Sequence, residues 1–150
     1  MLELLPGHTC VHFACHAGQN LAAPSEGALY LHDQPLHVTD LARLDLDTPE
    51  LAVLSACQTA VGGTELPNEA IHLAAALLLG NFRHVVSTLW PVGDDSARRI
   101  TDEVYRVLGD SKGCIHPNRT AQALHAAVDQ ARRRDPDRPL MWASHVHFGP

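Results

Sequence analysis

Three short runs of the chain are apolar almost throughout, and they limit the possible folds more than any other feature of the sequence. They are residues 9–14, 51–56 and 84–89, with the sequences TCVHFA, LAVLSA and HVVSTL. Strands that are covered on both faces have this composition, whereas strands with one wet face alternate apolar and polar residues. The runs therefore predict a buried, mostly parallel sheet with helices on both faces.

Helical patterns alternate with these runs along the chain. The best defined helix is expected at residues 69–79, since Gly80 and Asn81 follow it as a typical C-terminal pair. The other expected elements are helices at 40–44 (capped by Thr39), 94–108 and 120–134, a hairpin formed by 27–31 and 36–38, and a final strand at 142–148. The alternation predicts an α/β fold, and 150 residues suffice for one domain, residues 1–150.

Composition and charge exclude several classes of protein. The net charge of −6 provides no basic footprint for nucleic acid. The longest apolar run, residues 73–79, is far shorter than the roughly 20 residues that cross a bilayer. No export signal opens the sequence, and the four cysteines include no CxxC pair, so we expect free thiols in a cytoplasmic protein that binds neither nucleic acid nor membrane.

The ends of the first two strands carry the residues of greatest chemical interest. Cys15-His16-Ala17-Gly18 follows the first strand, and Cys57 follows the second. Ligands of parallel α/β sheets bind beyond the carboxyl ends of the strands, so His16 and Cys57 would share one cleft if the two strands are neighbours. A thiol beside an imidazole is a nucleophile with its base. The alternative interpretation is that Cys57 is a small core residue.

Four segments in order resemble the CHAT domain, a family of caspase-like proteins often fused to tetratricopeptide repeats. They are HFACHAG (12–18), LAVLSACQTAVGG (51–63), NEAIHLAAALLLGNFRHVVSTLWPVGDD (68–95) and WASHVHFGP (142–150). The resemblance implies a caspase-like three-layer α/β/α fold and a cysteine endopeptidase. In it Cys57 is the nucleophile, His16 is the base, and the N–H groups of Ala17 and Cys57 hold the oxyanion. His12 matches a core position of the family motif. The resemblance implies no metal and no organic cofactor.

Two features depart from the family pattern. Ala17 stands where the family usually has glycine, which carries a steric cost if that position needs a positive φ. The family also usually has one or two strands before the first motif, so we expect a sheet that lacks its N-terminal strands and a domain that is truncated at its N-terminus. An unpaired strand edge would then favour self-association or binding of a complementing segment.

Other functions compete with the peptidase. The main one is a catalytically silent caspase-like module that binds a regulatory partner, such as a tetratricopeptide-repeat protein, instead of cleaving a protein substrate. A zinc site is the second alternative; its ligands would be Cys10, His12, Cys15 and His16, completed by His145 and His147. Glu26, Glu69, Asp94 and Asp95 would either form an acidic substrate pocket or, at the helix starts, simply complement the helix dipoles.

Overall fold

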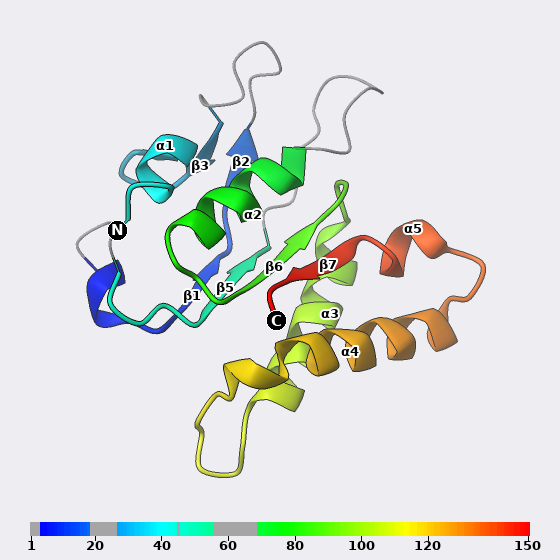
Figure 1. The fold of residues 1–150 in the computed structure, drawn as a ribbon. Helices are drawn as coiled ribbons and strands as arrows, with labels where there is room; N and C mark the ends of the chain where they lie inside the picture. The colour runs from blue at the N-terminus through cyan, green and yellow to red at the C-terminus, as the bar shows by residue number, and fades with distance from the viewer. Residues whose placement is uncertain (1–3, 19–26, 45, 56–68) are drawn as a thin grey trace.

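A four-stranded sheet forms the centre of the protein. The computed structural model describes residues 4–18, 27–44, 46–55 and 69–150. The strands are β1 (Cys10–Phe13), β5 (Leu51–Leu54), β6 (His84–Thr88) and β7 (His145–Phe148), in the order β1-β5-β6-β7 (Figure 1). The first three are parallel and β7 is antiparallel to β6, which confirms a mostly parallel sheet. The first two predicted strands are direct neighbours.

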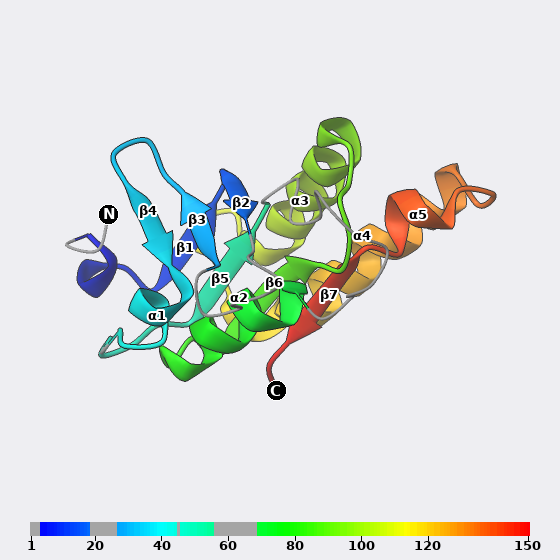
Figure 2. The same cartoon turned by 90° about the horizontal axis from the view of Figure 1, so that it is seen from above.

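Helices cover both faces of this sheet (Figures 1 and 2). Strand β5 shows how: Ala52 and Leu54 pack into a core with α2 (Glu69–Leu79), whereas Leu51 and Val53 pack into a second core on the opposite face. That second core is completed by α3 (Asp94–Leu108) and α4 (Thr120–Arg134). Because successive side chains of a strand point to opposite faces, a strand that is apolar throughout must be covered on both faces. The result is the expected three-layer α/β/α sandwich.

A second, smaller sheet lies beside the first. It consists of β2 (His16–Gly18), β3 (Ala28–Tyr30) and β4 (Pro35–His37), all antiparallel, and leads into α1 (Val38–Leu41). The predicted hairpin is confirmed as β3 and β4. Two expectations were wrong here. Residues 16–18 form a strand instead of a loop, because β3 offers them a pairing edge. The helix begins before Thr39, because Asp40 accepts a hydrogen bond from the His37 N–H at 3.2 Å.

The remaining elements are short. They are η1 (Leu5–Gly7), η3 (Pro117–Arg119) and α5 (Pro139–Trp142). The final strand was expected from residue 142, but Pro139 begins a helical turn, as proline does at first helical positions, and β7 starts at His145. Among the described residues, no helix has the length and apolar character needed to span a membrane.

Strand β1 is an edge strand of the central sheet, since β5 is its sole partner among the described strands. The carbonyls of Thr9 and Phe13 accept hydrogen bonds from the N–H groups of Leu51 and Ser55. Backbone groups of a strand alternate between its two sides, so the peptide groups of Cys10 and His12 point away from β5. An edge of this kind was expected from the sequence.

Candidate active site

The strands that precede His16 and Cys57 in the sequence end side by side. Phe13, the last residue of β1, is paired with Leu54, the last residue of β5. His16 is the third residue after Phe13, and Cys57 is the third residue after Leu54. His16 opens β2 and is exposed, opposite Tyr30 on β3, which is 53% exposed. Cys57 lies outside the described residues, so its position relative to His16 stays a prediction.

Ala17 adopts ordinary strand geometry. Among the described residues other than glycine, Asn81 is the one with a positive φ, so the suspected strain at Ala17 is absent. The Ala17 side chain is 4% exposed and packs in the core beneath the small sheet. Alanine is therefore compatible with this position, and the argument for a silent module that rested on the missing glycine loses its basis.

The backbone N–H of Ala17 points away from its partner strand β3. The N–H of Val38 donates to the carbonyl of Gly27 at 2.8 Å, which identifies 27–38 and 29–36 as the hydrogen-bonded pairs between β3 and β4. Leu29 therefore directs its backbone toward β4, and its partner Ala17 on β2 directs its own N–H away from β3. Pairing with β3 does not use this N–H, as an oxyanion donor requires.

His12 is not a core residue, contrary to expectation. It is exposed at the edge of the sheet, and its Nε2 lies 2.7 Å from the hydroxyl of Ser55, the first residue after β5. Ser55 Oγ lies 3.3 Å from Thr101 Oγ1 on α3. The His12 ring also lies against Tyr105, with 5.6 Å between the ring centroids. Although the His12 side chain is exposed, the groups packed around its ring partly desolvate it and lower its pKa, so the imidazole is neutral at neutral pH.

A pocket of about 240 Å³ opens beside these residues, between the strand ends and α3. Its wall is formed by Ala14 from the segment after β1 and by residues of α3, namely Asp94, Ala97, Arg98, Thr101 and Asp102. Asp94 and Asp95 are both exposed in the first turn of α3, and of the two only Asp94 is among the residues that line this pocket. Glu69 is the first residue of α2, and Glu26 lies outside the described residues.

The sequence prediction missed Ser55 and Thr101 as site residues. A signal was present, because His12 and Ser55 are polar residues in otherwise apolar runs and sit near the same end of adjacent strands. Thr101 carried no such signal, since its contact depends on how α3 packs against the sheet. It is 9% exposed.

The structure does not support the zinc alternative. Within the described part of the chain, no three His, Cys, Asp or Glu side chains come together as metal ligands. His145 and His147 lie on β7, which is at the opposite edge of the sheet from β1. They therefore cannot complete a site with Cys10 and His12.

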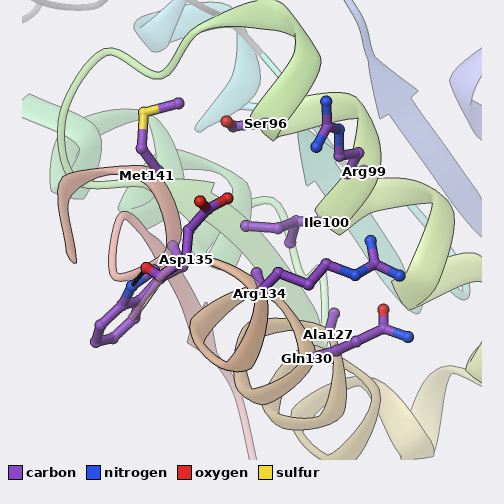
Figure 3. Close-up of a pocket in the computed structure, with 10 residues that line it drawn as sticks. Ser96, Arg99, Ile100, Ala127, Gln130, Arg134, Asp135 and Met141 are labelled. Carbon is purple, nitrogen blue, oxygen red and sulfur yellow. Dashed lines mark hydrogen bonds between the residues drawn. The ribbon is translucent and has the colours of Figure 1, made fainter. Parts of the chain in front are cut away.

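A second pocket lies between α3, α4 and α5 (Figure 3). Ile100 and Ala127 are buried at its apolar side, and Arg99 and Arg134 border it from neighbouring helices. The Trp142 indole N–H donates to the carbonyl of Asp135 at 3.0 Å and holds α5 against the end of α4. Neither a cysteine nor a histidine is among the described residues that line this pocket, so these residues provide no cysteine–histidine pair.

The fold and the strand ends define a class of protein. A three-layer α/β/α sandwich around a mostly parallel sheet has the architecture of caspase-like proteins. The family model of the CHAT domain matches residues 1–150, and the chain belongs to this family, which is related to the caspase-like peptidases. A search of the curated proteins gave no match.

Proposed function

We propose that this chain is a cysteine endopeptidase domain with Cys57 as nucleophile and His16 as general base and then general acid. The observation that carries the proposal is the parallel pairing of β1 with β5, ending at Phe13 and Leu54. His16 and Cys57 follow these ends at equal distances in the sequence, so in this proposal they lie close together beyond the carboxyl ends of the two strands. Membership of the CHAT family supports the same roles.

The proposed reaction begins when His16 takes the proton of the Cys57 thiol. The thiolate attacks the carbonyl carbon of the scissile peptide bond, and the negative charge moves to the carbonyl oxygen. The N–H groups of Ala17 and Cys57 donate to this oxyanion. The imidazolium of His16 then gives its proton to the leaving amine, and water attacks the acyl-enzyme with His16 as base, which regenerates the thiol. In this scheme no metal or organic cofactor takes part.

Exposure of His16 suits this role, because the base must reach the substrate. Tyr30 shares its face of the small sheet and is placed to contact a bound peptide. Asp94, in the pocket beside the strand ends, would favour a basic side chain in the substrate. The substrate in this proposal is a cytoplasmic protein, and a tetratricopeptide-repeat protein is the regulatory partner that the family relationship suggests.

Thiol alkylation tests the proposal without knowledge of the substrate. Brief iodoacetamide treatment at neutral pH, followed by mass-spectrometric mapping, should label Cys57 faster than Cys10, Cys15 or Cys114, because only Cys57 is expected to have a base beside it. Cys15 is a useful internal reference, since burial raises its pKa. His16→Ala should remove the advantage of Cys57. Equal labelling of all four thiols in the natural protein would refute the peptidase and favour the silent binding module.

A further inference from the structure

Three side chains from three elements join at the end of β5. Ser55 makes contact with His12 on β1 through its hydroxyl at 2.7 Å and with Thr101 on α3 at 3.3 Å. We name this group the Ser55 clamp. The backbone N–H of Ser55 also donates to the carbonyl of Phe13 at 3.1 Å. Ser55 is thus held to the neighbouring strand by backbone and side chain, and to the helix layer by side chain.

The hydrogen bonds of the clamp form a consistent set. Partial desolvation lowers the pKa of His12, so the imidazole is neutral at neutral pH, and its Nε2 accepts or donates the hydrogen bond with the Ser55 hydroxyl according to the tautomer. Ser55 Oγ and Thr101 Oγ1 also lie within hydrogen-bonding distance, and either hydroxyl can be the donor. Tyr105 lies against the His12 ring and restricts its rotation. All three polar side chains thus have a hydrogen-bonding partner within the clamp, which is typical of side chains that fix a geometry.

The place of the clamp in the chain gives it functional significance. One residue, Ala56, separates Ser55 from Cys57. Two residues of chain span at most about 7 Å, so the position of Ser55 limits where Cys57 can lie. The clamp therefore holds the chain at a point two residues before the proposed nucleophile.

We propose that the Ser55 clamp is a positioning device for Cys57, with His12, Ser55 and Thr101 as positioning residues. The inference rests on the function proposed above for Cys57. The clamp acts by setting the position and direction in which the chain leaves β5. Its expected contribution is large, since displacement of a reacting group by about 1 Å costs about 100-fold in rate.

The test compares variants that remove a hydrogen-bonding group of the clamp with conservative variants that retain one. Ser55→Ala and His12→Leu each remove the hydrogen-bonding group of the side chain. Ser55→Thr retains a hydroxyl, and His12→Gln retains a polar group that can bond to Ser55. The first readout is the alkylation rate of Cys57 divided by that of Cys114 in the same molecule. We expect the deletions to lower this ratio by about tenfold or more and the conservative variants to remain near the natural value. Val11→Ala, on the opposite face of β1, is the control for general weakening and should leave the ratio unchanged.

A second readout separates the clamp from the proposed chemistry. Amide hydrogen exchange at residues 55–58 should increase in Ser55→Ala and stay unchanged in Val11→Ala. If Cys57 of the natural protein shows no advantage and His16→Ala has no effect, the peptidase fails, and hydrogen exchange alone decides on the clamp. The proposal is refuted if Ser55→Ala leaves both readouts unchanged, or if Val11→Ala lowers the alkylation ratio equally. It is also refuted if the conservative variants lower the ratio as much as the deletions do. Thr101→Val replaces Ser55→Ala if that variant does not fold.

Discussion

Ala17 illustrates how one backbone angle decides between two interpretations of a residue. A requirement for a positive φ would have made alanine a defect, but residue 17 lies in β2 with its methyl group in the core. The same position directs its N–H away from β3. Alanine is thus suited both to the strand and to a backbone donor role.

Replacing Ala17 with glycine should therefore bring no benefit. Glycine in a strand costs about 0.5–1 kcal/mol through backbone entropy, and loss of the buried methyl adds about 0.8 kcal/mol. We expect Ala17→Gly to lower the free energy of unfolding by about 1–2 kcal/mol, measured by chemical denaturation, and to leave the alkylation rate of Cys57 unchanged. Faster alkylation or a higher melting temperature would show that the position prefers glycine geometry after all.

At the scale of single elements, the end of α2 is a helix stop with a defined geometry. The N–H groups of Asn81 and Phe82 donate to the carbonyls of Leu78 and Leu77, with Asn81 in the left-handed region at a φ of 68°. This is a Schellman motif, and Phe82 and Leu77 are both buried in the same core. Gly80 has a different purpose: a Cβ there would lie 2.8 Å from the carbonyl oxygen of Leu41, where α1 packs on α2.

The two residues should respond in opposite directions to substitution. Asn81→Gly should raise the free energy of unfolding by about 0.5–1 kcal/mol, because glycine has no steric cost in the left-handed region. Gly80→Ala should lower it by about 1–3 kcal/mol, because the added methyl must displace backbone. Thermal and chemical denaturation measure both. Stabilisation by Gly80→Ala would show that α1 yields easily.

Two histidines on strand β7, His145 and His147, make the stability of the fold sensitive to acid. Burial lowers the pKa of His145 to about 4, and burial together with the neighbouring His84 lowers the pKa of His147. His84 Nδ1 and His147 Nε2 lie 3.1 Å apart, and His84 is 2% exposed. The unfolded chain takes up protons near pH 6.5, whereas folded His145 resists them until about pH 4. Stability is therefore full above about pH 6.5 and falls as the pH drops toward 4.

Replacement of His145 should reduce this acid sensitivity. One pKa unit corresponds to about 1.4 kcal/mol, so the lowered pKa of His145 accounts for at most about 3.5 kcal/mol of lost stability across the window. We expect His145→Gln to flatten the dependence of the unfolding free energy on pH between about 6.5 and 4. His125→Gln, at an exposed position of α4, is the matched control and should keep the natural slope. Equal slopes for all three proteins would contradict the assignment.

Local patterns in the sequence predicted the elements whose apolar periodicity and end signals agree. Residues 69–79 and 120–134 form helices as expected, and the apolar runs form the parallel strands. Strand β2 escaped prediction because three residues are too few for a pattern and depend on an edge supplied by β3. The Ser55 clamp escaped for a related reason, since His12 and Ser55 are 43 residues apart and meet through strand register.

At the scale of the whole molecule, the edge of β1 is the feature with the widest consequences. Its outward peptide groups at Cys10 and His12 are in position to pair with another strand. We expect the isolated chain to self-associate through this edge, with a mass that rises with concentration in analytical ultracentrifugation. Cys10→Pro removes one outward N–H at the first residue of the strand, where proline is tolerated, and should shift the protein toward the monomer. A single monomeric species at all concentrations would show that this edge does not pair.

The order of strands in the central sheet also has a kinetic consequence. Each pairing joins distant parts of the chain, as in Cys10 with Leu51, Leu51 with His84, and Val85 with Phe148. Every one of these closures costs chain entropy before any contact repays it. Each step in the assembly of the sheet thus closes a long loop at an entropic cost, and β6 stays without its second partner until β7, near the C-terminus, pairs with it. Refolding should be slow for a protein of this size, and the uncovered flank of β6 is the surface on which misassembly between molecules would begin.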